Sequence, residues 1–263
     1  MRKLEDKVAV ITGASKGIGG GIARVYAKYG AKLVLAARGE KVIEFAKTLC
    51  DEGYDAIGVM TDVRDKASVD NLVKAAIEKY GTIDVLVNNA GVCVLGNLVS
   101  SADEDRDYHI DINIKGAWNV TKAVAPIMMQ KKDGKIVVMS SVTGDMVADP
   151  GEAAYAMSKS ALVGFAKAVA RELADYNITV NAICPGYVRT PLVEGMARQS
   201  CPENPESVID GIAAAVPLKR LAQPEEIGEL AAFLGCYESS YITGAQIVID
   251  GGSTLPETFT MGV

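Results

Sequence analysis

Tyr155 and Lys159 are the side chains in this sequence best suited by type and spacing to acid–base chemistry. Positions four residues apart share one face of a helix, so the phenol and the ammonium would lie side by side. A free phenol has a pKa near about 10, and an ammonium about 4 Å away favours its ionised form by roughly 4 kcal/mol, or about three pKa units. The pair therefore predicts a phenol that transfers protons near neutral pH, with the Ser141 hydroxyl holding the same substrate oxygen.

The spacing of Tyr155 and Lys159 also arises by chance, and the competing interpretation places both side chains on the solvated face of a surface helix. A catalytic pair needs a bound reactant beside it. A binding site for a second reactant elsewhere in the chain would therefore favour the catalytic interpretation.

The turn after the first expected strand is suited to holding a phosphate group. Residues 8–11 form a β-branched run, and glycines then recur at Gly13, Gly17 and Gly19 before a helical pattern begins. Glycines let a backbone approach a pyrophosphate closely, and the N–H groups at a helix start supply donors and a positive dipole. The order of strand, glycine turn and helix predicts a dinucleotide-binding loop. The alternative is that the glycines only make a tight turn.

The end of the second expected strand, Lys32–Ala37, indicates which dinucleotide would bind. A carboxylate there would accept a hydrogen bond from the ribose 2′-hydroxyl of NAD and would repel the 2′-phosphate of NADP. This chain has Ala37 followed by Arg38, and Lys16 in the glycine turn is a second cation. A guanidinium binds phosphate through two parallel N–H contacts, so we expect NADP(H) rather than NAD(H). The alternative for Arg38 is an ordinary solvated loop position.

Strand and helix signals alternate along the chain, with amphipathic helices expected over residues 69–80 and 107–127 and around Tyr155. Residues 187–217 are predicted to be more irregular. The alternation predicts an α/β protein, a three-layer doubly wound Rossmann fold with a seven-stranded parallel sheet, in one domain over residues 1–263. Ligands bind at the carboxyl ends of strands in such sheets, where the glycine turn, Asn88, Ser141 and Pro185 are all expected. The seven expected strands are residues 8–11, Lys32–Ala37, Ala56–Met60, 83–87, 135–139, 179–184 and 246–250.

Composition and charge exclude several classes of function. The 263 residues carry a formal net charge of -6, which argues against nucleic-acid and anionic-membrane partners. Five scattered cysteines without a C-x-x-C pair indicate neither a disulfide framework nor a metal site. The charged N-terminus leads directly into a strand, and no apolar run reaches the roughly 18 residues that span a bilayer. We therefore expect a soluble, cytoplasmic protein.

Taken together in their order and spacing, the motifs resemble those of the short-chain dehydrogenase/reductase family over essentially the full chain. Each motif alone is weak, whereas the complete set is specific. The set comprises Thr12-Gly13-x-x-x-Gly17-x-Gly19, Asp62, Asn88-Asn89-Ala90-Gly91, Asn113, Ser141, Tyr155-x-x-x-Lys159, Pro185-Gly186 and Asp250-Gly251-Gly252.

The resemblance implies a catalytic role for four residues. Tyr155 would protonate the carbonyl oxygen, or take the proton of an alcohol, while hydride moves between the substrate carbon and the nicotinamide. Lys159 would lower the phenol pKa and bind the nicotinamide ribose. Ser141 would donate a hydrogen bond to the substrate oxygen. Asn113 would hold a water that links Lys159 to solvent.

The resemblance also implies a set of cofactor-binding residues beyond Tyr155 and Lys159. The glycine turn would cradle the pyrophosphate, the residues after the third strand would meet the adenine, and those after the fourth would line the adenosine ribose. The residues that follow Pro185 and Gly186 would contact the carboxamide and the phosphates. The pyrophosphate set is Gly13, Ser15, Gly17, Ile18 and Gly19, and the adenine set is Asp62 and Val63. The ribose set is Asn89, Ala90 and Gly91, and the set for the carboxamide and phosphates is Val188 and Thr190.

The function expected from these residues is that of an NADP(H)-dependent oxidoreductase that interconverts a ketone or aldehyde and an alcohol. The alternatives are an NADPH-binding sensor or scaffold without catalysis and, among enzymes, an enoyl reductase or an epimerase. The family likeness suggests a homotetramer that acts on a small molecule.

Two further features have open interpretations. His109 lies four residues before Asn113, and it is either a packed or interface side chain or part of a proton path. Residues 255–263 extend past the last expected strand, and they either dock on a neighbouring subunit or the site rim or fray.

Overall fold

The computed structural model describes residues 3–255, and these contain seven parallel strands in a single sheet. Across the sheet the order is β3-β2-β1-β4-β5-β6-β7, and every neighbouring pair is parallel. The predicted α/β fold with a seven-stranded parallel sheet is confirmed. The strands are β1 Val8–Thr12, β2 Lys32–Ala37, β3 Ala56–Met60, β4 Val85–Asn88, β5 Gly134–Met139, β6 Ile178–Pro185 and β7 Gln246–Ile249.

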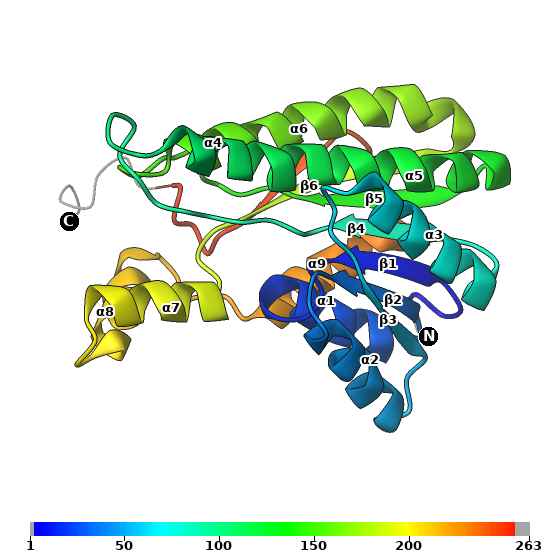
Figure 1. The fold of residues 1–263 in the computed structure, drawn as a ribbon, viewed down its shortest axis with the longest axis horizontal. Coiled ribbons are helices and arrows are strands. Elements are labelled where there is room, and N and C mark those ends of the chain that lie inside the picture. The colour runs from blue at the N-terminus through cyan, green and yellow to red at the C-terminus, as the bar shows by residue number, and fades with distance from the viewer. Residues whose placement is uncertain (1–2, 256–263) are drawn as a thin grey trace.

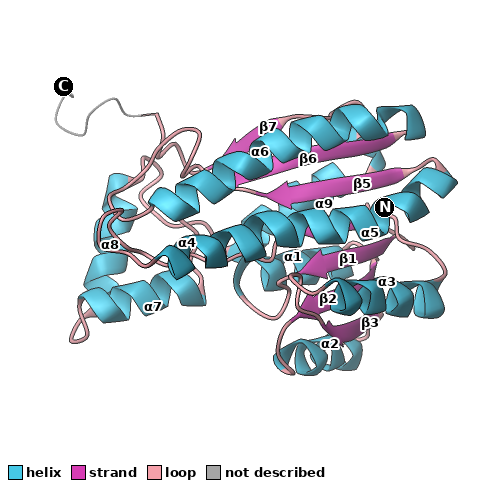
Figure 2. Cartoon of the chain, turned by 45° about the horizontal axis from the view of Figure 1, so that its top comes forward, coloured by secondary structure: helices cyan, strands magenta, loops and turns pink. Residues whose placement is uncertain are grey.

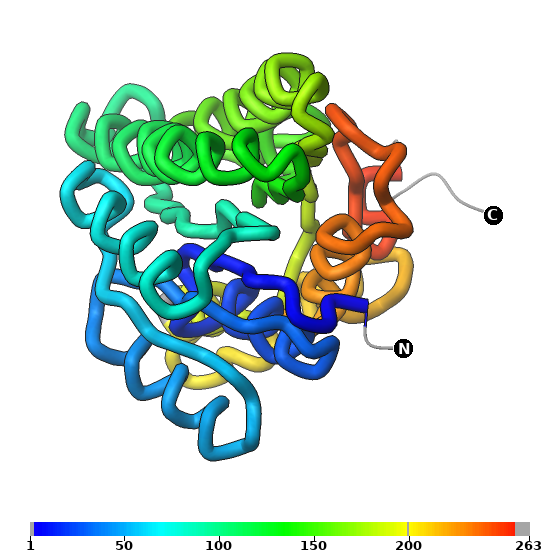
Figure 3. The backbone as a smooth tube through the Cα atoms, turned by 90° about the vertical axis from the view of Figure 1, so that its right-hand side faces the viewer, coloured from blue at the N-terminus to red at the C-terminus, as the bar shows by residue number. Residues whose placement is uncertain are grey.

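Helices cover both faces of the sheet, which buries the apolar side chains of its strands on two sides. On one face lie α1 (Gly17–Lys28), α2 (Lys41–Asp51) and α9 (Pro224–Gly235), and on the other lie α3 (Lys66–Tyr80), α5 (Gly116–Lys131) and α6 (Ala153–Leu173). Figures 1 and 3 show the two helical layers separated by the strands. The three layers match the predicted doubly wound architecture.

The direction of strand addition reverses between β1 and β4. From β1 the chain builds β2 and β3 toward one edge, and then crosses to add β4 on the other side of β1. At such a reversal the loops after the two central strands separate and leave a crevice for a ligand. The glycine turn after β1 and the Asn-Asn-Ala-Gly segment after β4 both lie at this point.

The long helix predicted over residues 107–127 differs from the structure in extent and in regularity. The helical stretch runs through α4 (Asp103–His109), a π-helical turn η1 (Ile110–Lys115) and then α5. A π turn holds one more residue than an α turn, and such turns often occur at functional sites. Asn113 is buried within this turn.

The prediction of an irregular segment over residues 187–217 is wrong, because the segment contains α7 (Pro191–Ser200) and α8 (Pro205–Ala215). Each helix begins with a proline in its first turn after an N-cap, Thr190 or Asn204, whose side chain accepts a backbone N–H. These start signals are present in the sequence, but the two helices are short, with 10 and 11 residues. Figures 1 and 2 place α7 and α8 beyond the carboxyl ends of the strands.

Within residues 3–255, no helix combines the length and the apolar character that crossing a membrane requires. The tail beyond residue 255, for which the sequence leaves docking and fraying open, lies outside the described residues.

The glycine turn is supported from behind by close packing of α1 against α9. A Cβ at Gly21 would lie 2.5 Å from the carbonyl carbon of Pro224, so only a glycine allows the two backbones to approach this closely. Gly20, one residue earlier, has more room, since the nearest atom to a Cβ there is the Ala14 oxygen at 3.7 Å.

We predict that Gly21→Ala destabilises the protein by about 1–3 kcal/mol, because the added methyl group forces α1 and α9 apart. Gly20→Ala is the matched control, and it should be neutral or stabilising by up to about 1 kcal/mol, since alanine favours a helix. Urea unfolding of both variants measures the difference. Equal midpoints for the two variants would contradict the packing argument.

Candidate active site

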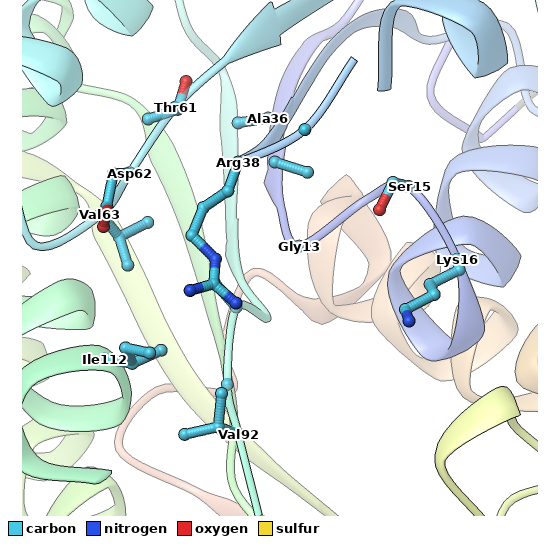
Figure 4. Close-up of a pocket in the computed structure, with 14 residues that line it drawn as sticks. Gly13, Ser15, Lys16, Ala36, Arg38, Thr61, Asp62, Val63, Val92 and Ile112 are labelled. Carbon is cyan, nitrogen blue, oxygen red and sulfur yellow. The ribbon is translucent and has the colours of Figure 1, made fainter. Parts of the chain in front are cut away.

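A pocket of about 270 Å³ opens at the carboxyl ends of β1 to β4, where strand addition reverses. It contains many of the residues that the sequence analysis assigns to the cofactor (Figure 4). Residues 36, 37, 39, 61, 92 and 112 also line it, and the sequence analysis did not assign them to binding. The lining residues are Gly13, Ser15, Lys16, Ala36, Ala37, Arg38, Gly39, Thr61, Asp62, Val63, Ala90, Gly91, Val92 and Ile112.

The glycine turn has the shape that a phosphate-binding loop needs. Gly13 and Gly17 have φ of 65° and 57°, in the left-handed region that favours glycine. A Cβ at Gly19 would lie 2.4 Å from the Gly13 oxygen, so the turn also packs too closely for any side chain there. The N-cap of α1 is Lys16, whose side chain has no acceptor, so the N-cap side chain leaves the first N–H groups of the helix open. The loop and helix start therefore fit the pyrophosphate of a dinucleotide.

Two hydrogen-bonding residues fasten the loop after β4 to the loop after β1. The Asn89 side chain donates to the carbonyls of Thr12 at 2.9 Å and of Gly13 at 3.3 Å. The Thr12 hydroxyl in turn accepts the backbone N–H groups of Asn89 and Ala90, each at 3.0 Å. The Asn89 side chain thus braces the glycine turn, and among residues 89–91 only Ala90 and Gly91 line the pocket.

Arg38 reaches from the end of β2 into the pocket, between Gly13 on one side and Val63 and Ile112 on the other (Figure 4). Its Nη1 donates to the Tyr108 hydroxyl at 3.3 Å, and it forms no ion pair with a carboxylate among residues 3–255, although its charge contributes to the lowered pKa of Asp62. Lys16 lines the same pocket but lies on the far side of Gly13 from Arg38 in Figure 4, so the structure does not bring the two predicted cations together.

The carboxylate at the end of β3 is neutralised within the chain. Asp62 forms an ion pair with Arg64 at 2.6 Å, in which Nε and Nη2 of the guanidinium donate to the two carboxylate oxygens, and these hydrogen bonds lower the pKa of the Asp62 carboxyl. Val63 beside it is buried and supplies an apolar wall. Both residues line the pocket, as the sequence analysis expects for an adenine site.

Tyr155 and Lys159 occupy one face of α6, as their spacing predicts, and both side chains face the interior. The Lys159 Nζ lies 5.6 Å from the centre of the Tyr155 ring and donates to the Met139 carbonyl at 2.9 Å. The Ser141 hydroxyl lies close enough to the Tyr155 phenol to lower its pKa. Lys159 is only 5% exposed, so the interpretation of this pair as solvated surface positions is wrong.

The direction of the phenol pKa shift differs from the sequence-based expectation. Burial raises the pKa of Tyr155, and the Ser141 hydroxyl only partly opposes this effect. Burial also lowers the pKa of Lys159 to about 8, since the ammonium loses hydration. The expectation assumed an exposed ammonium next to the phenol oxygen, whereas the Lys159 Nζ is directed at a backbone carbonyl.

Asn113 is tied to the loop after β4 rather than facing open space. Its side-chain oxygen accepts the Val92 N–H at 2.8 Å, and its amide nitrogen donates to the Val92 carbonyl at 3.0 Å and to the Ser158 hydroxyl at 2.9 Å. The side chain therefore links the π turn, the loop and α6. The expectation that Asn113 holds a water stays a prediction.

Gly91 joins the pocket to the residues around Tyr155. A Cβ at Gly91 would lie 3.3 Å from the Asn113 side-chain oxygen and 3.5 Å from the Lys159 Nζ. A ligand that enters through the pocket and passes Gly91 therefore arrives at Lys159. This continuity matches a dinucleotide with one end in the pocket and the other at the reacting groups.

The predicted binding residues after β6 lie apart from the pocket lining. Thr190 caps α7, and its methyl group would be 3.6 Å from a Cβ at Gly17, so it packs beside the glycine turn. Val188 is buried and pairs with Ala222 in an isolated β-bridge, while Pro185 and Gly186 form the strand end. Their predicted contacts with the carboxamide and phosphates stay predictions.

The residues that sequence reasoning missed are side chains that reach the site from distant elements. Tyr108 contacts Arg38 across 70 positions of sequence, and no local pattern signals that contact. The Thr12 hydroxyl and the walls formed by Val92 and Ile112 were equally unassigned. Val92 directly follows Gly91, and Ile112 directly precedes Asn113. This adjacency to assigned residues was the only indication in the sequence that the two side chains line the site.

Known proteins resemble this chain over almost all of its length. Residues 13–254 match the family model described as enoyl-(acyl carrier protein) reductase. The chain is 60% identical to the oxidoreductase UcpA of Escherichia coli strain K12 over 263 residues, which is 100% of both chains. It is 39% identical over 254 residues to the 3-oxoacyl-(acyl-carrier-protein) reductase FabG of Thermotoga maritima, over 95% of this chain and 98% of that one.

A solved structure shares the fold at useful sequence identity. L-sorbose reductase from Gluconobacter frateurii, complexed with NADPH and L-sorbose, matches with a TM-score of 0.93 and 32% identity, over 97% of this chain and 100% of that one. Together with the motifs at the strand ends, these matches cover the glycine turn and the residues around Tyr155. The chain therefore belongs to the short-chain dehydrogenase/reductase family of oxidoreductases.

Proposed function

We propose that the protein is an NADP(H)-dependent oxidoreductase that interconverts a ketone or aldehyde and an alcohol. The observation that carries the proposal is the pair of hydroxyls of Ser141 and Tyr155 beside Lys159, next to Gly91 of the pocket. The structure of L-sorbose reductase with NADPH and L-sorbose supports this proposal. NADPH is the proposed kind of cofactor, and L-sorbose is a ketose, which belongs to the proposed class of carbonyl substrates.

The residues present fit a nicotinamide dinucleotide, and they divide its binding among them. Gly13, Gly17 and the N-terminus of α1 would hold the pyrophosphate, and Ala90 and Gly91 would lie along the adenosine ribose. When bound, the cofactor supplies or accepts the hydride. The protein contributes orientation, proton transfer and exclusion of water around the substrate carbon.

The Ser141 and Tyr155 hydroxyls together can handle the substrate oxygen. Because the Ser141 hydroxyl acts on the Tyr155 phenol at close range, both groups can meet a single carbonyl oxygen placed between them. The raised pKa keeps the phenol protonated at neutral pH, so Tyr155 donates its proton as the carbonyl oxygen gains negative charge. Ser141 donates a hydrogen bond to the same oxygen and stabilises the developing charge.

Lys159 is suited to stabilising the phenolate that forms once Tyr155 has given up its proton. With a pKa of about 8 it is predominantly an ammonium at neutral pH, and it lies within the same buried region as the phenol. In alcohol oxidation the same charge would favour the ionised phenol that accepts the proton of the alcohol.

NADP(H) is proposed over NAD(H) from the end of β2. Ala37 stands there in place of a carboxylate, and the Arg38 guanidinium donates to a hydroxyl but forms no ion pair with a carboxylate among the described residues. A guanidinium without an acidic partner is available to a phosphate.

A second candidate is reduction of a carbon–carbon double bond, which the description of the matching family model as enoyl-(acyl carrier protein) reductase favours. Incubation with NADPH and either ketones or 2-enoyl compounds, followed by product analysis, separates the two reactions. Saturable NADPH binding without oxidation by any compound would instead favour the non-catalytic sensor.

The assembly and location are proposals as well. We propose a homotetramer in the cytoplasm, with contacts along α5 and α6. In support, Trp118 on α5 is 56% exposed and packs against Phe165 on α6, with ring centres 5.9 Å apart, so the paired helices carry an aromatic surface toward solvent.

We predict that Tyr155→Phe lowers kcat by at least about 100-fold, because it removes the proton donor. NADPH affinity, measured by fluorescence titration, should stay within about threefold, since a hydroxyl loss leaves the pocket intact. Tyr80→Phe, on α3 and bonded to Asp55, is the matched control and should keep its activity. Substantial turnover by Tyr155→Phe would disprove the assignment.

We predict that Ala37→Asp combined with Arg38→Ile shifts preference toward NAD(H). Loss of a charge-assisted phosphate contact should weaken NADPH binding by about 10- to 100-fold, and the new carboxylate should accept the 2′-hydroxyl of NADH. Kd values for both cofactors measure the shift. Unchanged NADPH preference would show that another group binds the phosphate.

We predict that Lys159→Met stabilises the fold at pH 7 by about 1–3 kcal/mol while abolishing activity. The folded pKa of about 8 lies below the unfolded value, so the native state binds fewer protons between about pH 8 and 10.4, and wild-type stability rises through that window. The advantage of the variant should therefore shrink toward pH 10.

Urea unfolding of both proteins from pH 7 to 10 tests this prediction. Lys167→Met, at an exposed position on the same helix, is the control and should show no such dependence. A stability difference that stays constant with pH would contradict a depressed pKa at Lys159.

A further inference from the structure

His109 is the single histidine of the sequence and is fully buried at the end of α4. Its ring meets that of Tyr155 edge to face, with centres 6.2 Å apart and an interplanar angle of 67°. An edge-to-face contact restricts the orientation of both rings. His109 is thus in direct contact with the proposed proton donor, although its polar atoms point elsewhere.

Both ring nitrogens of His109 are engaged by backbone groups. Nε2 lies 3.1 Å from the Val94 nitrogen, and an N–H can only donate, so Nε2 is the acceptor. Nδ1 lies 2.6 Å from the Asp105 carbonyl, so it carries the proton and donates it. This arrangement requires the neutral ring in one tautomer. With neither nitrogen open to a third partner, His109 is not placed to relay protons.

Val94 belongs to the segment between β4 and α4, which borders the reacting groups. Three hydrogen-bonded contacts hold this segment at alternate residues. Asn113 binds both backbone groups of Val92, His109 binds the N–H of Val94, and the N–H of Gly96 donates to the Gly151 carbonyl at 2.9 Å. The His109 contact is the central one.

The fastened segment follows directly on Gly91, which adjoins Lys159. Release of Val94 would free the chain between the contacts at Val92 and Gly96, close to Gly91, where an added Cβ would lie 3.5 Å from the Lys159 Nζ. The same side chain supports the Tyr155 ring from the other side. One imidazole therefore links the wall of the pocket to the proton donor.

We propose that His109 is a positioning residue, whose Nε2 fastens Val94 and with it the wall of the pocket beside Tyr155. The catalytic part of this inference rests on the proposed oxidoreductase function. The fastening of Val94 does not depend on it.

Two amide substitutions separate the two hydrogen bonds of the ring. In His109→Gln the side-chain oxygen can reach the position of Nε2 and accept the Val94 N–H. In His109→Asn the shorter amide can replace only Nδ1, so the bond to the Asp105 carbonyl is kept and that to Val94 is lost. Asp105→Ala is a control, because only the backbone carbonyl of Asp105 takes part.

The first measurement is steady-state carbonyl reduction with NADPH. We expect kcat to fall by about 10- to 100-fold in His109→Asn, since small displacements of reacting groups have effects of this size, while the KM for NADPH stays within about twofold. His109→Gln should recover kcat to within about threefold of the wild type. A general loss of folding would lower the apparent kcat of both variants together.

The second measurement is amide hydrogen exchange of residues 92–97 by mass spectrometry, which needs no activity. Exchange should accelerate by about 10-fold or more in His109→Asn and stay near wild type in His109→Gln. Wild-type exchange and kcat in His109→Asn, or equal losses in the two variants, would overturn the proposal. An inactive wild-type protein would remove the catalytic role, and the exchange data would still decide whether His109 fastens Val94.

Discussion

The hydrogen bonds that join Thr12 to the segment after β4 hold the two halves of the site together. Strand addition reverses at this point, so the loops after β1 and β4 would otherwise separate. The Thr12 hydroxyl accepts two backbone N–H groups, and the Asn89 amide returns bonds to the Thr12 and Gly13 carbonyls. The glycine turn and Gly91 are thereby fixed relative to each other, and with them the two ends of the proposed cofactor site.

Predictions from the sequence were correct where they depend on the spacing of residues within one helix or on the order of strands along the chain. Helical periodicity places Tyr155 and Lys159 on one face of α6, and the convergence of parallel strand ends brings Gly13, Asp62 and Gly91 into one region. The side-chain partners of those residues could not be foreseen. Tyr108 meets Arg38, and Asn113 binds Val92, only because elements far apart in sequence pack together. The starts of α7 and α8 were marked by Pro191 and Pro205, a signal that the sequence analysis did not use.

Burial explains why the simple electrostatic argument for Tyr155 gave the opposite direction of pKa shift. Coulomb's law with one dielectric treats the phenol and the ammonium as a pair in a uniform medium. In the folded protein each group first loses its hydration, and the Lys159 ammonium satisfies its donors on the Met139 carbonyl. The neutral phenol is thus favoured, and the site is arranged to give a proton in carbonyl reduction.

The π turn between α4 and α5 determines how far one helix is rotated about its axis relative to the other, and so which side chains of both face the interior. At about 100° per residue, the stretch from His109 to Met128 is about one residue too long to complete five regular α-helical turns. The wider turn absorbs that residue, so His109 and Asn113 face the interior together with Val120, Val124 and Met128. Deleting a single residue from this turn would rewind the stretch as a uniform α-helix and rotate α4 by about 100°, which would carry His109 away from Tyr155 without changing any side chain of the site.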